Sequence, residues 1–145
     1  MTTADDRDDE VLEHEVLTEA LGALAGPGSR GARFAARFLH KDVREVELRL
    51  PLPFEHALAL VGALLDREGP ELHPRRPEPD PDRRTFRVLT RGGVGGMNPV
   101  LVTVRAVRGG SDATEVRLRC AAFEGLFKQR SAQKAVDRLA GLLTA

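Results

Sequence analysis

Apolar and polar residues alternate in three consecutive segments of the second half of the chain: 84–91, 100–108 and 114–123. Successive side chains of a β-strand point to opposite faces, so this pattern predicts three strands that share one apolar face. The expected apolar positions are Phe86, Val88, Val100, Val102, Val104, Val116, Leu118 and Cys120. A fourth alternating segment, 43–50, predicts an earlier strand that Pro51 ends.

Apolar residues recur at the three- and four-residue spacing of an amphipathic helix in three other segments. These are 9–25, 54–68 and a last one that begins between Leu126 and Ser131 and runs to about Leu143. Asp8 or Asp9 is expected to cap the first helix. A shorter apolar segment, 32–39, carries Phe34 and Phe38 one helical turn apart.

The segments between these elements have the composition of turns and loops. Five prolines between residues 70 and 83 predict an exposed linker, with a short edge strand around Leu72 as an option. Gly109–Asp112 suits a hairpin turn between the last two strands. The Gly-rich segment 91–99 lacks the ending of a phosphate-binding loop and leads into a strand, so a plain loop is expected.

Together these elements predict an α+β fold with the order β-α-β-β-β-α. Strands joined by short connections pair antiparallel, giving a sheet of about four strands with two helices on its apolar face. Residues 1–40 are expected to form an acidic N-terminal helical appendage with a Gly/Pro linker, and residues 41–145 the α+β domain.

The order of elements over residues 43–143 resembles the helix-grip (START-like) and TBP-like architectures. The chain departs from the helix-grip pattern because it has too few strands to close a deep cavity. The segment 123–134 also resembles a strand-to-helix junction found in uncharacterised bacterial proteins, which implies no activity.

Composition argues against a membrane-spanning or disulfide-bonded protein. Apolar residues make up 41% and charged residues 30% of 145 residues, and no segment is apolar for long enough to span a bilayer. The acidic N-terminus is not a secretory signal, so a cytoplasmic location is expected. A single cysteine excludes an internal disulfide and a cysteine-based zinc site, and no metal or cofactor is expected.

The predicted strands place five arginines on the face opposite the apolar one: Arg87, Arg91, Arg105, Arg117 and Arg119. The planar guanidinium group binds carboxylates and phosphates through paired hydrogen bonds, so this face is a candidate anion-binding site. The alternative is a solvated sheet face in which Glu45, Glu47 and Glu115 balance arginines supplied by a GC-rich genome.

Charge is distributed unevenly along a chain of zero net charge. Residues 1–20 hold eight acidic residues against one arginine, so the remaining chain carries a net charge of +7. If the first helix folds back over the sheet, then Glu13, Glu15 and Glu19 could meet the arginines, within one chain or by exchange in a dimer. The alternative is a solvated acidic helix whose leucines lie on the domain.

Lys128 and Arg130 lie near the expected start of the last helix, where backbone N–H groups attract an anion. They are candidates for holding a phosphate or carboxylate, and Glu124 is the internal alternative to such a ligand.

Candidate catalytic groups are few. His14, His40, His56 and His73 are scattered without metal-ligand spacing, and no serine lies in a nucleophile elbow. Cys120 is expected to be buried and inert.

The function that these observations favour is a non-catalytic binding or interaction module for an anionic or amphipathic small molecule or an acidic protein, with a homodimer as an option. One alternative is an enzyme that uses Glu124 or His56 for proton transfer. Another is nucleic-acid binding by the arginines, which the scarcity of aromatic residues disfavours.

Overall fold

The computed structural model describes residues 4–24, 40–72, 78–92, 98–124 and 130–145. Three helices and four strands lie within these ranges and form an α+β fold, as the sequence predicts. In chain order they are α1 (Ala4–Leu24), β1 (His40–Leu50), α3 (Phe54–Asp66), β2 (Arg83–Gly92), β3 (Asn98–Arg108), β4 (Thr114–Glu124) and α4 (Ser131–Leu143). The predicted segment 32–39 and most of the Gly-rich loop lie outside the described residues.

The four strands form one antiparallel sheet in the order β1-β4-β3-β2. Its register confirms the two faces that the alternating pattern predicts. On one face Val104 pairs with both Phe86 and Leu118, and on the other Arg105 pairs with Arg117. β4 is an inner strand, and from Cys120 to Glu124 its residues are buried without alternation.

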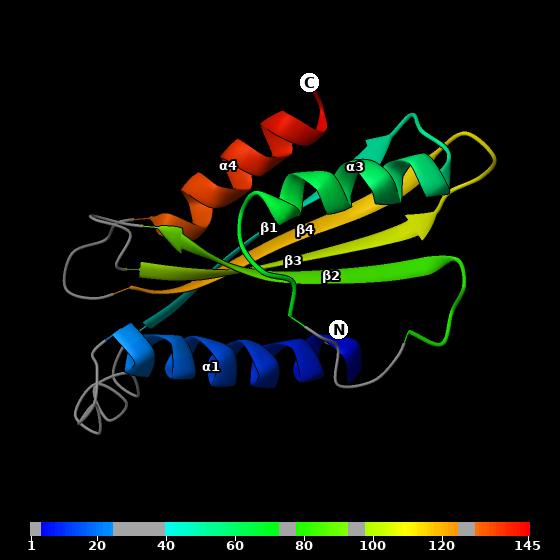
Figure 1. Cartoon of the computed structure of the whole chain (residues 1–145). Coiled ribbons are helices and arrows are strands. Elements are labelled where there is room, and N and C mark those ends of the chain that lie inside the picture. Colours follow the sequence, from blue (N-terminus) through cyan, green and yellow to red (C-terminus); the bar gives the residue numbers. More distant parts are fainter. Residues whose placement is uncertain (1–3, 25–39, 73–77, 93–97, 125–129) are drawn as a thin grey trace.

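Helices α3 and α4 cover the apolar face of the sheet (Figure 1). Because each helix has a single apolar stripe, it buries one side and exposes the other. α3 buries Phe54, Ala57, Val61 and Leu65, and α4 buries Ala132, Ala135, Val136, Leu139 and Leu143. The main core therefore lies between the two helices and the sheet, as the sequence predicts.

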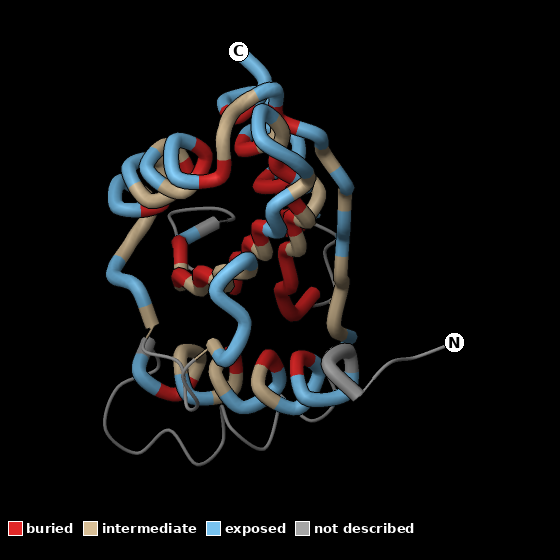
Figure 2. The backbone as a smooth tube through the Cα atoms, turned by 90° about the vertical axis from the view of Figure 1, so that its right-hand side faces the viewer, coloured by how far each residue is buried: buried red, intermediate tan, exposed pale blue. Residues whose placement is uncertain are grey.

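Helix α1 lies on the opposite face of the sheet (Figure 1) and turns its buried residues toward it (Figure 2). Leu17 is fully buried in a small apolar cluster with Leu101, Ala121 and Phe123. The helix begins at Ala4, so the expectation that Asp8 or Asp9 caps it is wrong. Both residues lie in its second turn, beyond the free backbone N–H groups that a capping side chain would bind.

The connections follow the turn chemistry of the sequence. Gly110 has a φ of 136° between β3 and β4, a conformation that glycine adopts without strain. The N–H of Leu72 donates to the carbonyl of Arg87 over 2.7 Å, and Glu71 forms an isolated bridge with Val88, so this segment lies along the edge of β2. No helix among the described residues is long and apolar enough to cross a membrane.

Candidate anion-binding sheet face

Four arginines from three neighbouring strands lie on the side of the sheet that α1 covers. We call this surface, comprising Arg87, Arg105, Arg117 and Arg119, the arginine face. Arg105 of β3 is directly opposite Arg117 of β4, and Thr103 separates Arg87 from Arg119 in the next row. Like charges directly opposite each other destabilise a sheet, so this arrangement requires anionic groups nearby.

Asp9 of α1 supplies one such group and binds two strands at once. Its Oδ1 lies 2.6 Å from a terminal guanidinium nitrogen of Arg87, and its Oδ2 lies 3.2 Å from one of Arg105. The side chain of Asp9 is only 6% exposed. A single carboxylate therefore pairs with arginines from both β2 and β3 in a site from which most water is excluded.

Glu13, one turn further along α1, binds the third strand. Its Oε1 accepts a hydrogen bond from Nε of Arg119 over 2.8 Å. Glu45 of β1 binds the same arginine over 3.3 Å and also binds Arg117 over 2.6 Å. Glu45 thus belongs to the sheet itself, as the alternative interpretation of this face expects, whereas Asp9 and Glu13 come from the helix.

Burial and ion pairing have different net effects on the pKa values of Glu13 and Arg119. Burial raises the pKa of Glu13 above its ordinary value of 4.5, although Arg119 and Lys41 act to lower it. Burial also acts to lower the pKa of Arg119, but the Glu13 and Glu45 carboxylates outweigh it, so that pKa is raised. The side chain of Glu13 is 2% exposed and that of Arg119 is 17% exposed, so the carboxylate bears more of the desolvation.

An apolar row lies directly beside the arginine face. Across the sheet it consists of Val43, Ala121, Leu101 and Leu89. Leu17 of α1 packs on this row. Beyond it, the rings of His14 and Phe123 meet edge to face with centroids 5.5 Å apart. The surface that α1 covers is therefore amphipathic, with guanidinium groups at one end and apolar side chains at the other.

The contact between α1 and the sheet leaves polar atoms without partners. Among the described residues, the buried Oε2 of Glu13 and the buried Nε of Arg105 make no hydrogen bond. An unsatisfied buried polar atom costs about 1–3 kcal/mol. The helix therefore fits the face with complementary charge but incomplete hydrogen bonding.

Two of the other predicted site residues, Arg91 and Arg130, lie away from this contact. Arg91 is exposed at the end of β2, on the same side of the sheet as Arg87. Arg130 is exposed, with a φ of 53°, immediately before α4. Lys128 lies outside the described residues.

The N-terminus of α4 already has an internal anion. Glu124 Oε1 accepts a hydrogen bond from the backbone N–H of Ser131 over 3.1 Å. The side-chain amide of Asn98 donates to the hydroxyl oxygen of Ser131 over 2.9 Å. Glu124 thus occupies the position that a phosphate or carboxylate ligand would take, the internal alternative that the sequence offers.

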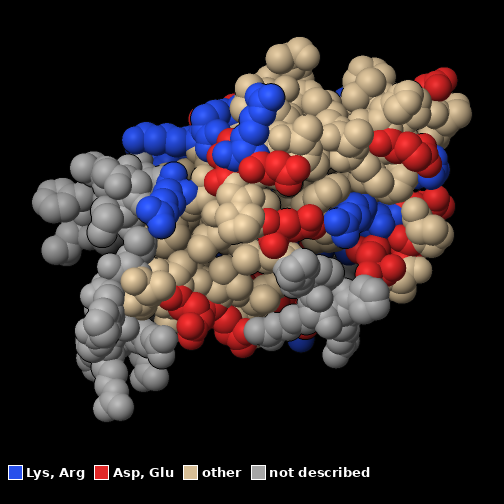
Figure 3. Space-filling view, viewed as in Figure 1, with Lys and Arg blue, Asp and Glu red and all other residues tan. Residues whose placement is uncertain are grey.

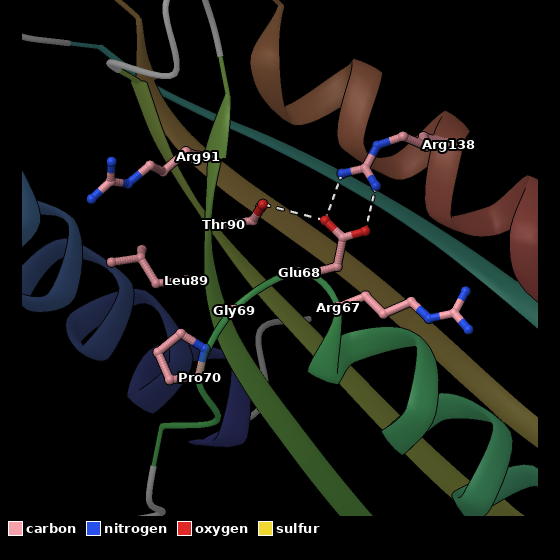
Figure 4. Close-up of a pocket in the computed structure, with 8 residues that line it drawn as sticks. All are labelled: Arg67, Glu68, Gly69, Pro70, Leu89, Thr90, Arg91 and Arg138. Carbon is pink, nitrogen blue, oxygen red and sulfur yellow. Dashed lines mark hydrogen bonds and ion pairs between the residues drawn. The ribbon is translucent and has the colours of Figure 1, made fainter.

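A hollow of about 650 Å³ lies where the end of α3 meets β2 and α4. Figure 4 shows Glu68 at its centre, where the carboxylate binds Arg138 and accepts a hydrogen bond from Thr90. The side chains of Arg67 and Arg91 point away from Glu68. The hollow therefore lacks converging cationic groups, and the arginine face is the stronger candidate for an anion.

The catalytic candidates are placed as follows. His56 is exposed in the first turn of α3, and Glu124 is engaged at the start of α4. Burial raises the pKa of the Cys120 thiol to about 12, so it stays protonated at neutral pH. Among the residues that the structure describes, no group of three His, Cys, Asp or Glu side chains could hold a metal ion.

Sequence reasoning did not identify Asp9 as a partner of the arginines. The available signal was its spacing from Glu13 and Leu17, because residues at i, i+4 and i+8 share one helix face. The apolar stripe that predicts this helix adjoins the face that carries these two carboxylates.

No family model matches the sequence, and no curated protein matches it. Similar solved structures include a START superfamily protein from Mycobacterium smegmatis, with 11% identity and a TM-score of 0.38 over 70% of this chain and 93% of that chain. Another is the Zhui aromatase/cyclase from Streptomyces sp. R1128, with 12% identity and a TM-score of 0.35 over 72% of this chain and 93% of that one.

Proposed function

We propose that this chain is a non-catalytic binding module whose arginine face holds an anionic or amphipathic ligand. The observation that carries the proposal is the juxtaposition of arginines from three strands with a row of apolar side chains. Guanidinium groups hold a carboxylate or phosphate through charge-assisted hydrogen bonds, and the apolar row holds a hydrophobic part of the same ligand. The contacts of α1 support this proposal, because its carboxylates and Leu17 occupy those two parts. A ligand would take the place of these groups.

The distribution of charge at the surface supports a local site rather than a broad polyanion-binding surface. In the view of Figure 3, basic and acidic side chains lie beside one another over much of the molecule. Several exposed arginines are paired within the chain, such as Arg49 with Glu115 and Arg108 with Glu55. Nucleic-acid binding requires a continuous basic footprint, so the small-ligand or protein-partner function is favoured.

The test is isothermal titration calorimetry, in which dodecyl phosphate, an anion with an apolar tail, is titrated into the full chain. We expect saturable binding that weakens about tenfold in Arg119→Gln, because a charge-assisted hydrogen bond is lost. The matched control is Arg67→Gln, the same substitution at an exposed arginine beyond the end of α3. Its affinity should equal that of the unaltered chain.

Equal affinities in all three proteins, or no binding, would contradict the proposal. Native mass spectrometry of the purified chain is an independent measurement, because a bound ligand adds a mass that is lost on denaturation. A mass that stays bound in the unaltered chain and is absent from Arg119→Gln would support this site.

A further inference from the structure

We propose that the arginine face is a docking site for an acidic helix of a partner protein, and that α1 is its resident occupant, which such a helix displaces. This inference rests on the proposed function and names its partner. The partner helix would present carboxylates at positions i and i+4 and a leucine at i+8.

The pattern is read directly from α1. Asp9, Glu13 and Leu17 follow one another at four-residue spacing and are all buried against the sheet. Asp9 binds Arg87 and Arg105, Glu13 binds Arg119, and Leu17 packs on Leu101 and Ala121. The sheet thus recognises three successive turns of a helix, two by charge and one by an apolar contact.

The composition of the contact makes α1 a replaceable occupant. Among the residues of α1 whose burial is described, Leu17 is the fully buried large apolar side chain and Val16 and Leu21 are partly buried. The other large buried groups are the carboxylates of Asp9 and Glu13. Burying a charged pair costs desolvation that its attraction only partly offsets. The raised pKa of Glu13 and the unpartnered atoms of Glu13 and Arg105 show that α1 leaves part of this cost uncompensated.

A helix that satisfied these atoms would bind more tightly than α1 does. It would have to compete with a helix of the same chain, and such intramolecular binding acts as a high effective concentration of α1. A partner therefore succeeds only by better complementarity or when α1 is weakened. The arrangement selects against weakly fitting acidic segments.

The experiment weakens α1 without altering the sheet. Full chains carrying Asp9→Asn are compared with the unaltered chain and with a control, Asp8→Asn. The control removes the same charge from an exposed position of the same helix. The probe is a fluorescein-labelled peptide of residues 4–24, and a second peptide carries Asp9→Asn and Glu13→Gln. Binding is measured by fluorescence anisotropy and the oligomeric state by light scattering.

We expect the labelled peptide to bind the Asp9→Asn chain about tenfold more tightly than the other two chains. The amide-substituted peptide should bind weakly, and adding Arg119→Gln to the weakened chain should abolish the gain. Equal peptide affinity for all three chains would overturn the inference. So would a weakened chain that dimerises by exchanging α1, because the second occupant would then be a copy of this chain.

The same chains separate this inference from the proposed function. If the weakened chain binds dodecyl phosphate but not the peptide, the face is a ligand site and the partner-helix inference is wrong. If it binds neither, the proposed function fails as well. Hydrogen exchange of α1 is the second measurement. Protection in the weakened chain equal to that in the unaltered chain would overturn the claim that carboxylates hold α1.

Discussion

At the scale of single residues, Glu13 is where burial and ion pairing oppose each other most directly. Burial raises its pKa even though Arg119 and Lys41 act against that shift and Asp9 adds a small shift in the same direction. A carboxyl group with a raised pKa binds a proton more readily in the folded than in the unfolded chain. Its contribution to stability is therefore greatest below its ordinary value of 4.5 and is lost as the pH rises through the raised pKa.

This sign gives a prediction for Glu13→Gln, which cannot titrate. Relative to this variant, the unaltered chain should lose free energy of unfolding as the pH is raised from about 4.5 to 7. Urea unfolding followed by circular dichroism measures the difference, and Glu10→Gln, at an exposed position of the same helix, is the control. A difference that is constant or that grows with pH would contradict the assignment of the shift to burial.

At the scale of elements, the backbone at the end of α3 closely approaches that of β2 at Gly69. A Cβ at Gly69 would clash with the carbonyl oxygen of Leu89, a backbone atom that moves only if the strand moves. A Cβ at Gly141 of α4 would meet nothing within 4 Å. The same substitution thus has opposite expected effects at the two positions.

We predict that Gly69→Ala lowers the free energy of unfolding by about 1–3 kcal/mol, because the clash forces α3 and β2 apart. Gly141→Ala is the matched control and should raise it by about 0.5–1 kcal/mol, because alanine is the better helix former. Thermal and urea unfolding would measure both. Equal effects of the two substitutions would show that the approach at Gly69 is not a constraint.

The elements also show what sequence reasoning can and cannot reach. Alternation over 84–91 and 114–119 determines which side of each strand faces the core. Successive side chains point to opposite faces, so only one orientation of the strand buries all its apolar side chains. The C-terminal half of β4 breaks that rule, since Ala121 and Phe123 are buried beneath α1 while Cys120 and Ala122 face the main core. The apolar run was visible in the sequence, but nothing local indicated which element would cover it.

The candidate site was predictable only in part. The arginines follow from strand alternation, whereas their pairing with Asp9 depends on where a helix from the other end of the chain comes to lie. The Glu68–Arg138 pair in the hollow has the same origin, since it joins the turn after α3 to α4 by contacts absent from any local pattern. The periodicity of the sequence determines which face of a strand each side chain is on, and tertiary packing determines which side chains form ion pairs.

At the scale of the whole molecule, α1 places the carboxylates of Asp9 and Glu13 against the sheet, and residues 21–145 carry a net charge of +7. The folded chain therefore hides part of its positive charge beneath a helix. Moving α1 away would expose that charge without changing the net charge of the protein, and anionic surfaces would bind it more strongly.

We predict that Leu17→Asp, which places a charge among Leu101, Ala121 and Phe123, displaces α1 and raises the salt concentration needed for elution from heparin. Val11→Asp is the control, because Val11 is 60% exposed and the change in net charge is identical. Elution of both variants at the same salt concentration would show that α1 does not mask the arginines.

The strand order has a consequence for the way the chain reaches this structure. β2, β3 and β4 are joined in sequence and can pair as successive hairpins, whereas β1 precedes them all and pairs with the last strand, β4. Loop closure over such a separation costs more conformational entropy, so the pairing of β1 is expected to follow formation of the β2–β3–β4 meander. Until β1 pairs, β4 is an edge strand with unpaired backbone N–H and C=O groups, although it is an inner strand of the finished sheet.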